Sequence, residues 1–417
     1  CMNILIFNTS EIGIAPNRLF KSLIKKGINV KMLVRDKLTN DENVVSINTT
    51  WLKCQINSFR FLWERIIILL SNKIDRKNIF KVSIANTGSN VLNNNCVKEA
   101  DIIHLHWINQ GFLSLHDIFL LTQNKPIVWT MHDMWPCTAI CHHSWGCEGF
   151  TKNCGMCPFL KSKREKDLSY RIWNKKKFIA SSNIHIVTVS SWLAMMAKKS
   201  SLTKNLNVTV IPNVIDTTVF FKRNKAVVRK ELSFSLDKNI ILMGAARLDD
   251  PIKGFEYLEK ALLNLVTDKY RKEDILLLLF GTIKDLSILQ NIPVSYVWLG
   301  ALNDMNQIAE LYSAADVVVV PSFYETFGQT IIEAMACGCP AVSFNNSGQT
   351  DIIDHKVNGY LAQYKNVTDF AEGIDWALSN RNNQTMQESC IKKVQENYTE
   401  AIIAEKYISL YKNILKE

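Results

Sequence analysis

The chain alternates short apolar runs with amphipathic stretches, and it does so twice along its length. In the first half, NILIFN (3–8) is followed by the helical pattern RLFKSLIKKG (18–27). Strands that alternate with helices in this way form βαβ units on a parallel sheet, and nearly continuous apolar strands indicate a sheet covered on both faces. The later strand-like runs of this half are 29–36, 101–107, 126–133, 185–191 and 207–213.

The same alternation starts again after Asn213. Predicted strands cover 239–246, 274–281, 296–300, 316–322 and 340–344, and predicted helices cover 254–265, 305–315, 367–379 and roughly 397–415. A chain of 417 residues is too long for one ordinary core, so two domains are expected. We predict an α/β fold of two doubly wound domains, 1–214 and 215–396, with a last helix, 397–417, that packs back on the first domain. Residues 40–100 are rich in Asn and receive no assignment.

Charge is distributed unevenly between the two halves. Residues 1–215 hold 28 Lys and Arg against 13 Asp and Glu, a net charge of +15, whereas the remainder carries −5. A basic half suggests an anionic partner for that half, and a Lys-rich composition with solvated faces is the alternative. No basic run is interleaved with aromatic residues as in single-strand nucleic-acid binders, so we expect no nucleic-acid partner.

The apolar runs are all much shorter than the roughly 20 residues that cross a bilayer. The N-terminal residues also lack the basic, apolar and cleavage regions of a signal peptide. We therefore expect a soluble protein of the cytoplasm.

The stretch PSFYETFGQTIIEAMACGCP (321–340) places two acids, Glu325 and Glu333, around the start of a helix that is expected from about Phe327. Backbone N–H groups at a helix N-terminus bind anions, and Gly328 permits close approach of a phosphate. Carboxylates accept hydrogen bonds from hydroxyl groups. A ligand whose phosphate binds these amides and whose hydroxyl groups bind these acids would be a nucleotide sugar. The alternative is that Glu325 caps the helix while Glu333 lies on a solvated face.

This stretch resembles the donor-binding signature of the retaining, family-four glycosyltransferases of GT-B fold, which has the pattern P-S-x-x-E-x-F-G…E-A-M-A-x-G-x-P. Three further segments resemble other motifs of that family in the same order: VIPNVID (210–216), GAARLDDPIKGFEYL (244–258) and WLGAL (298–302). The resemblance covers essentially the whole chain and implies a GT-B fold, in which two Rossmann-like domains face each other across a cleft.

The resemblance also implies a set of donor-binding residues. Arg247 and Lys253 would hold the pyrophosphate, Glu325 would bind the sugar hydroxyls, and Glu333 the ribose diol. The remaining expected donor contacts are Gly13, Leu299, Gly300, Phe327, Gly328 and Gln329. Fixed cations and amides usually replace a metal in these folds, and no convincing D-x-D motif is present. We therefore expect metal-independent transfer with no catalytic cofactor.

His132 lies at the end of the strand-like run PIVWTMHD (126–133), where the family places a histidine near the transferred sugar. The resemblance makes His132 a catalytic candidate beside Arg247, Lys253 and Glu325, though not a nucleophile. It places Asp133 and Asn213 on the acceptor side. One departure concerns the turn after the first strand, where Gly13 is followed by Ile14 instead of a second glycine. The same turn lacks the G-x-G-x-x-G pattern of nicotinamide-dependent dehydrogenases.

Four cysteines, Cys141, Cys147, Cys154 and Cys157, lie within a loop expected over 137–158. Such clustering in an intracellular protein favours metal over disulfides, and four thiolates suit tetrahedral zinc. The spacing is not that of a standard finger, so free thiols or a redox pair stay open, and Cys137, His142 and His143 are substitute ligands. A similar insertion occurs in a subset of the family associated with bacterial capsule and exopolysaccharide assembly of the colanic-acid type.

The main hypothesis is a retaining hexosyltransferase of bacterial surface polysaccharide synthesis. It would use a UDP- or GDP-sugar and a glycan or lipid-linked acceptor. The alternatives are a nucleotide-sugar epimerase or hydrolase of the same fold, or a non-catalytic sugar-binding protein. The basic segments KSKREK (161–166) and KKK (175–177) suggest a peripheral contact with the anionic inner face of the cell membrane.

Overall fold

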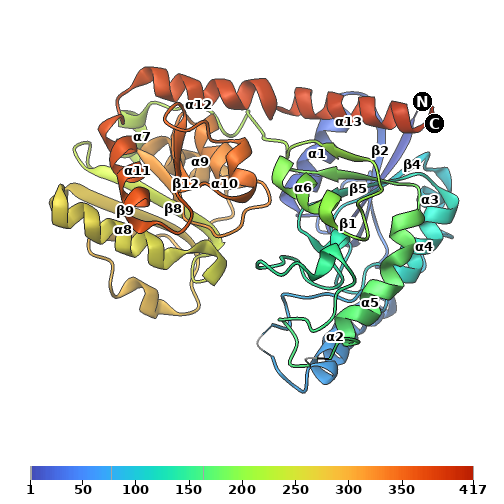
Figure 1. Ribbon diagram of the computed structural model, residues 1–417. Coiled ribbons are helices and arrows are strands. Elements are labelled where there is room, and N and C mark those ends of the chain that lie inside the picture. Colours follow the sequence, from blue (N-terminus) through green and yellow to red (C-terminus); the bar gives the residue numbers. More distant parts are fainter. Residues whose placement is uncertain (1, 77, 163, 417) are drawn as a thin grey trace. The chain divides into compact units, whose positions relative to one another are not determined.

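The computed structural model describes residues 2–76, 78–162 and 164–416. The chain forms two compact units (Figure 1). Unit 1 comprises Cys1–Pro212 together with Ile403–Glu417, and unit 2 comprises Asn213–Ile402. Each unit has its own parallel sheet with helices around it, so the predicted pair of doubly wound α/β domains is confirmed.

Unit 1 contains a seven-stranded sheet in the order β3-β2-β1-β4-β5-β6-β7. The pairs are all parallel, as expected from strands joined by helical crossovers. The strands are β1 (Asn3–Ser10), β2 (Asn29–Asp36), β3 (Val44–Ser46), β4 (Ile102–Leu105), β5 (Ile127–Met131), β6 (Ile184–Thr188) and β7 (Val208–Val210). The helices are α1 (Ile14–Lys25), α2 (Trp51–Ser71), α3 (Asn95–Glu99), α4 (Leu115–Asn124), α5 (Leu168–Lys176), α6 (Ser191–Lys199) and α13 (Glu400–Ile414).

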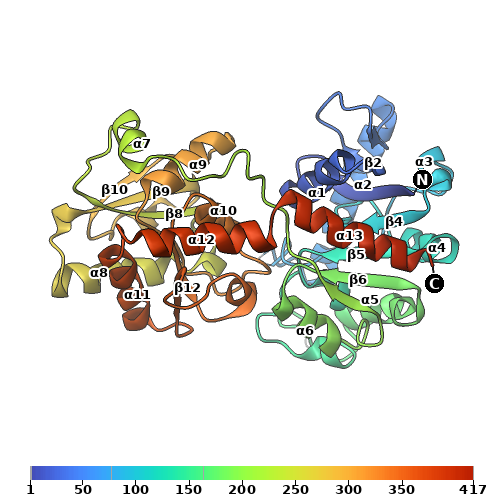
Figure 2. The same ribbon diagram turned by 90° about the horizontal axis from the view of Figure 1, so that it is seen from above.

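The last helix, α13, packs on unit 1 (Figure 2). Its Tyr411 hydroxyl lies 2.7 Å from Nδ1 of His104 on β4, and its Tyr407 hydroxyl lies 3.0 Å from Oγ1 of Thr130 on β5. Both tyrosines are buried. These contacts join the end of the chain to the centre of the first sheet, which explains why the final residues belong to unit 1.

Unit 2 contains a six-stranded sheet in the order β10-β9-β8-β11-β12-β13. The strands are β8 (Asn239–Arg247), β9 (Ile275–Thr282), β10 (Ser295–Trp298), β11 (Val317–Val320), β12 (Ala341–Phe344) and β13 (Gly359–Ala362). The helices are α7 (Lys225–Glu231), α8 (Phe255–Asp268), α9 (Met305–Ala314), α10 (Gln329–Ala336), α11 (Val367–Ser379) and α12 (Gln384–Asn397).

Each sheet has one position where the strand order reverses. In unit 1 the chain builds β1, β2 and β3 to one side and then places β4 on the other side of β1. In unit 2 it builds β8, β9 and β10 and then places β11 on the other side of β8. Ligands of doubly wound sheets bind outside the carboxyl ends of the strands at such a reversal. A ligand-binding site is therefore expected at the carboxyl ends of the strands that flank each reversal.

None of the helices within the described ranges has the length and apolar character needed to span a bilayer. Helix α2 lies within residues 40–100, for which no element was predicted, and no strand was predicted at β13. The last predicted helix, roughly 397–415, is observed as α13 with α12 directly before it.

Candidate active site

Lys253 and Glu325 meet at the strand-order reversal of unit 2. Lys253 ends a short 3-10 turn after β8, and Glu325 follows β11. The Lys253 Nζ atom lies 2.7 Å from Glu325 Oε1, although the residues are 72 positions apart. Gly254 holds φ at +64°, and a Cβ atom there would lie 2.1 Å from the Pro321 carbonyl oxygen. Glycine is therefore required for the turn to approach β11 closely enough to form the pair.

The backbone of Glu325 is held from the segment after β12. Its N–H donates to Ser347 Oγ at 3.0 Å, and its carbonyl accepts from the Gly348 N–H at 2.7 Å. Gly328, with φ at +116°, precedes α10, which begins at Gln329 and not near Phe327 as predicted. The left-handed conformation of Gly328 sets this later start, because a residue in that conformation cannot continue a helix.

Glu333 is buried within unit 2 and does not lie on a solvated face. Its Oε1 accepts from Gln329 Nε2 at 3.2 Å, and its Oε2 lies 3.5 Å from the Tyr312 hydroxyl. A buried carboxylate normally has its acceptor capacity satisfied by protein or ligand donors. Glu333 thus has the burial expected of a site residue.

Arg247 ends β8, and its Nε lies 3.1 Å from Asp249 Oδ1. Its side chain is 38% exposed, so the guanidinium is accessible to a ligand. Leu299 and Gly300 directly follow β10, and the carbonyl of Gly300 accepts from the Gly281 N–H at 2.7 Å. These three residues therefore lie at carboxyl ends of strands. Asn213, in contrast, is the first residue of unit 2, before its first helix and strand.

Gly13 lies in the loop after β1, next to the strand-order reversal of unit 1. A Cβ atom at Gly13 would lie 2.5 Å from Asn8 Nδ2, so the position is tightly packed even without a second glycine. The buried Glu11 fixes this loop by accepting from the backbone N–H groups of Leu38 at 2.7 Å and Thr39 at 2.9 Å. Burial by itself raises the pKa of Glu11, but these bonds and one from the Thr39 hydroxyl lower it overall. Glu11 is thus an ionised anchor.

His132 follows β5 and lies against a second histidine that follows β4. Its Nε2 lies 2.8 Å from Nδ1 of His106. Burial lowers the pKa of His132 to about 4, with the nearby Asp133 charge opposing part of the shift. Burial, together with His104 and His132, holds the pKa of His106 well below its usual range. Both imidazoles are therefore neutral at neutral pH, and each offers one donor and one acceptor nitrogen.

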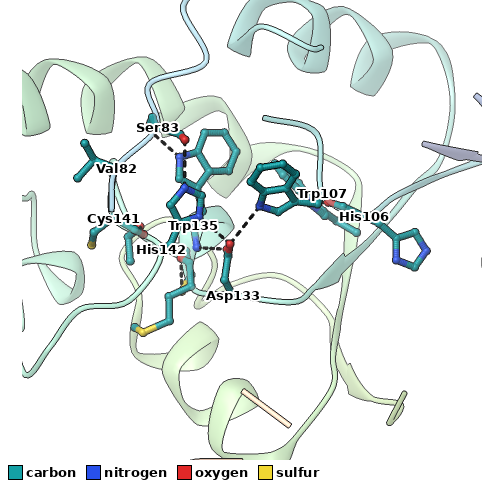
Figure 3. A network of polar contacts seen from close by, with 12 residues as sticks. Val82, Ser83, His106, Trp107, Asp133, Trp135, Cys141 and His142 are labelled. Atoms are coloured by element: carbon teal, nitrogen blue, oxygen red, sulfur yellow. Dashed lines mark hydrogen bonds and ion pairs between the residues drawn. The ribbon is translucent and has the colours of Figure 1, made fainter. Parts of the chain in front are cut away.

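Asp133 is the centre of a polar network inside unit 1 (Figure 3). Its Oδ2 lies 2.6 Å from Nδ1 of His142 and accepts from Trp107 Nε1 at 3.3 Å, while Oδ1 accepts from the Trp135 N–H at 2.8 Å. His142 Nε2 in turn lies 3.0 Å from Ser83 Oγ. Burial raises the pKa of Asp133, but the His142 charge and these hydrogen bonds lower it overall. The carboxylate is charged, and its hydrogen bonds hold it within the protein.

Several of these partners were missed in the sequence. His104, His106 and Trp107 occur together in DIIHLHW, and two polar residues ending an apolar strand are a signal that could have found them. His142 was considered only as a substitute zinc ligand, whereas the structure bonds it to Asp133. No local pattern indicates that pairing, because it depends on how the loop folds back.

Cys141, Cys147, Cys154 and Cys157 line one small cavity of the loop. Two of the sulfurs accept a hydrogen bond from the backbone N–H two residues later in the chain. The Gly149 N–H donates to Cys147 Sγ at 3.5 Å, and the Phe159 N–H donates to Cys157 Sγ. All four are free thiols. Yet within the described ranges no three or more His, Cys, Asp or Glu side chains are placed to hold a metal ion. The thiols share a cavity without forming a ligand set, so zinc stays a prediction.

The basic segment 175–177 is not the surface patch that its sequence suggests. Lys175 and Lys177 are exposed, but Lys176 is completely buried. Its Nζ donates to the carbonyls of Trp135 at 2.6 Å and Thr138 at 3.0 Å. Burial lowers the pKa of Lys176 to about 7. The prediction that all three lysines face a membrane is wrong for Lys176, because α5 turns this residue into the core. The other basic segment, 161–166, includes Lys163, which lies outside the described residues.

Two family models match this chain. The model "Glycosyltransferase Family 4" matches residues 17–219, and the model "Glycosyl transferases group 1" matches residues 224–397. An uncharacterised glycosyltransferase of Methanocaldococcus jannaschii is 34% identical over 167 residues, which are 38% of this chain and 42% of that protein. The chain therefore spans less than half the length of this relative.

Solved structures resemble the whole chain. The sucrose-phosphate synthase of Thermosynechococcus elongatus has a TM-score of 0.69 at 18% identity, with 100% of both chains covered. The Anabaena protein HepE, solved in complex with UDP and glucose, has a TM-score of 0.62 at 16% identity, covering 99% of this chain and 100% of that one. At such identities the likeness concerns the fold. With one family model matching most of unit 1 and the other most of unit 2, the chain has the GT-B fold and is similar to glycosyltransferases in both units.

Proposed function

We propose that the chain is a retaining hexosyltransferase that moves a sugar from a UDP- or GDP-sugar to a glycan or lipid-linked acceptor. The transfer reaction would be a step of bacterial surface polysaccharide synthesis. The observation that carries the proposal is the Lys253–Glu325 pair at the strand-order reversal of unit 2, beside Gly328 and the start of α10. The UDP in the HepE structure supports a UDP-sugar among the candidate donors.

The proposed roles follow from the charges of the site. Departure of a nucleoside diphosphate builds negative charge, which Lys253 and Arg247 would stabilise without a metal ion. A lysine ammonium has three donors, so Lys253 can bind Glu325 and phosphate oxygens together. The Glu325 carboxylate would accept from sugar hydroxyls, and Glu333 from the ribose diol.

Unit 1 would supply the acceptor side. His132 is a neutral imidazole at physiological pH and can donate or accept one hydrogen bond to a sugar hydroxyl without adding charge. Retention would follow from attack by the acceptor on the face that the leaving group vacates, without an enzyme-bound sugar. Asp133 would act indirectly, by holding the loop that follows His132.

The experiment is turnover of isotopically labelled UDP- and GDP-hexoses, with and without a bacterial extract of lipid-linked and glycan acceptors. We expect label in a glycan or lipid product, with the anomeric configuration of the donor by NMR. Replacement of Glu325 by Ala should abolish the product. Release of free sugar with no transfer would favour a hydrolase, and an inverted product would contradict retention.

A further inference from the structure

Helix α2 presents an apolar face to solvent on unit 1. Large apolar side chains recur at steps of four, three, four and seven residues, which places them on one face of a helix. This set, the α2 stripe, comprises Leu52, Ile56, Phe59, Trp63 and Leu70, all of them exposed. Phe59 is 58% exposed and Leu70 63%, values that are unusual for side chains of this size. Trp51 and Leu62 are also exposed and extend the stripe.

The opposite face of α2 is bonded firmly to unit 1. Glu64 is buried, and its Oε1 accepts from the N–H groups of Ile84 at 2.6 Å and Ala85 at 2.9 Å. Arg65 is buried beside it and pairs with Glu64 at 2.9 Å. Asn57 and Ile68 are buried on the same face. These contacts fix the rotation of the helix, so the α2 stripe cannot turn inward.

The stripe carries no charge and is followed by basic residues. Glu64 is the sole acid of α2 and is buried. The segment after the helix has exposed Lys73, Arg76 and Lys81, and it adds exposed Ile74 and Phe80 to the apolar surface. A helix with Trp, Phe and Leu on one face and cations beside it has the composition of helices that lie in the interface of an anionic membrane.

We propose that the α2 stripe, with Ile74, Phe80 and the three cations, docks unit 1 on a membrane surface that contains anionic lipid. The helix would lie parallel to the surface, because its other face is bonded to the protein. With 21 residues it is roughly 30 Å long. In Figure 1, α2 lies at the end of unit 1 opposite to α13. This inference goes beyond the transfer reaction and does not depend on it.

A bilayer fits this surface better than a protein partner does. Protein interfaces carry about one hydrogen bond per 100–200 Å². The polar side chains among the exposed residues of α2 are Lys53, Gln55 and Ser58, all within its first eight residues. The stripe therefore offers little to fix the register of a protein partner, whereas a lipid surface requires no register. The cations match the charge of anionic head groups.

The test is co-sedimentation of the full chain with phosphatidylcholine vesicles that contain phosphatidylglycerol. The double variant Phe59→Ser/Leu70→Ser should weaken binding by at least about tenfold, since each change removes an apolar group from the interface. A matched control replaces two equally exposed leucines of unit 2, Leu263→Ser/Leu286→Ser. This control should bind as the wild type does. Because all four side chains are exposed, the melting temperatures of both variants should stay near that of the wild type.

The charge contribution is tested with Lys73→Glu/Arg76→Glu. At low salt this variant should bind the vesicles more weakly than the wild type. At high salt, where the charges are screened, the two should bind equally. Three results would overturn the proposal: a wild type that ignores the vesicles, a stripe variant that binds as well as the control, or a wild-type dimer that the stripe variant converts to monomers. The last result would assign the stripe to a second copy of the chain.

Discussion

Lys253 and Glu325 place a cation and an anion within one hydrogen bond at the carboxyl ends of two adjacent strands, β8 and β11. The pair is partly exposed, so water and ligands can reach both charges. Such a pair contributes little to stability at a surface. The pair lies beside Gly328 and the α10 N-terminus. This position suggests that it binds a ligand with both phosphate and hydroxyl groups.

Replacement of Lys253 by Ala should lower kcat/KM at least about tenfold. The lost cation would no longer stabilise the leaving diphosphate, and each tenfold loss corresponds to about 1.4 kcal/mol. Lys260→Ala is the matched control, because Lys260 lies nearby on α8 with its side chain 59% exposed. Steady-state rates of donor consumption provide the comparison. Equal rates for the two variants would remove Lys253 from the site.

The buried histidines predict how stability depends on pH. A histidine of the unfolded chain titrates near pH 6.5, whereas burial lowers the pKa of His132 to about 4 and that of His104 to about 3. Between these values the unfolded state binds more protons, so stability falls as pH drops below about 6.5. Each histidine should lower the free energy of unfolding by roughly 1 kcal/mol between pH 7 and pH 5.5.

Urea unfolding at these two pH values measures the effect. His104→Asn should show a shallower pH dependence than the wild type, whereas His116→Gln, a change on the surface, should show the same dependence. A wild type that is equally stable at both pH values would mean that the histidines are not neutral and buried as described.

Most of the strands were predictable because their apolar runs are short and bounded, as with Val317–Val320 in DVVVVPS. The short strands β3 and β13 were not predicted. Helix α2 was not predicted either, because its apolar residues lie on both faces and blur the helical period. The Lys253–Glu325 site followed from a resemblance between motifs. The contact between His106 and His132 could not be predicted, because it depends on the order in which β4 and β5 pair.

The cysteine loop carries a prediction of its own. If the four thiols bind zinc, protein purified without added metal should contain about one zinc per chain by elemental analysis. The side chains would have to rotate to converge, since they do not form a ligand set as they stand. Without metal, burial raises the pKa of Cys154 to about 11 and that of Cys157 to about 12, which would leave unreactive neutral thiols.

Serine in place of both Cys154 and Cys157 should abolish the bound zinc. Serine at Cys54, an exposed cysteine of α2, is the control and should leave the zinc content unchanged. Protein that is purified without added metal and contains no zinc would refute the zinc prediction.

At the scale of the whole molecule, two units of the same doubly wound type carry different sets of residues. Unit 2 holds the cations and acids expected to bind the donor, and unit 1 holds neutral histidines and a hydrogen-bonded loop. Unit 1 also receives α13, so the two ends of the chain belong to one unit. This division of roles agrees with a donor and an acceptor bound by separate units.

Turnover should not require a divalent cation, because Arg247 and Lys253 would supply the positive charge at the diphosphate. Brief treatment with EDTA should therefore leave the rate of donor consumption unchanged. An immediate loss of activity that Mg²⁺ or Mn²⁺ restores would show that a metal shares this role. A slow loss over hours, accompanied by release of zinc, would instead point to the cysteine loop.

Hydrogen exchange of the full chain, measured by mass spectrometry with and without saturating UDP- and GDP-sugars, tests the donor site of unit 2 directly. We expect one of these donors to protect the amides of 247–254 and 325–333, the segments that contain Lys253, Glu325 and Glu333. The cysteine loop, 137–158, should show little change in the absence of acceptor. Protection confined to unit 1, or none with any donor, would contradict a nucleotide-sugar site at the carboxyl ends of β8 and β11.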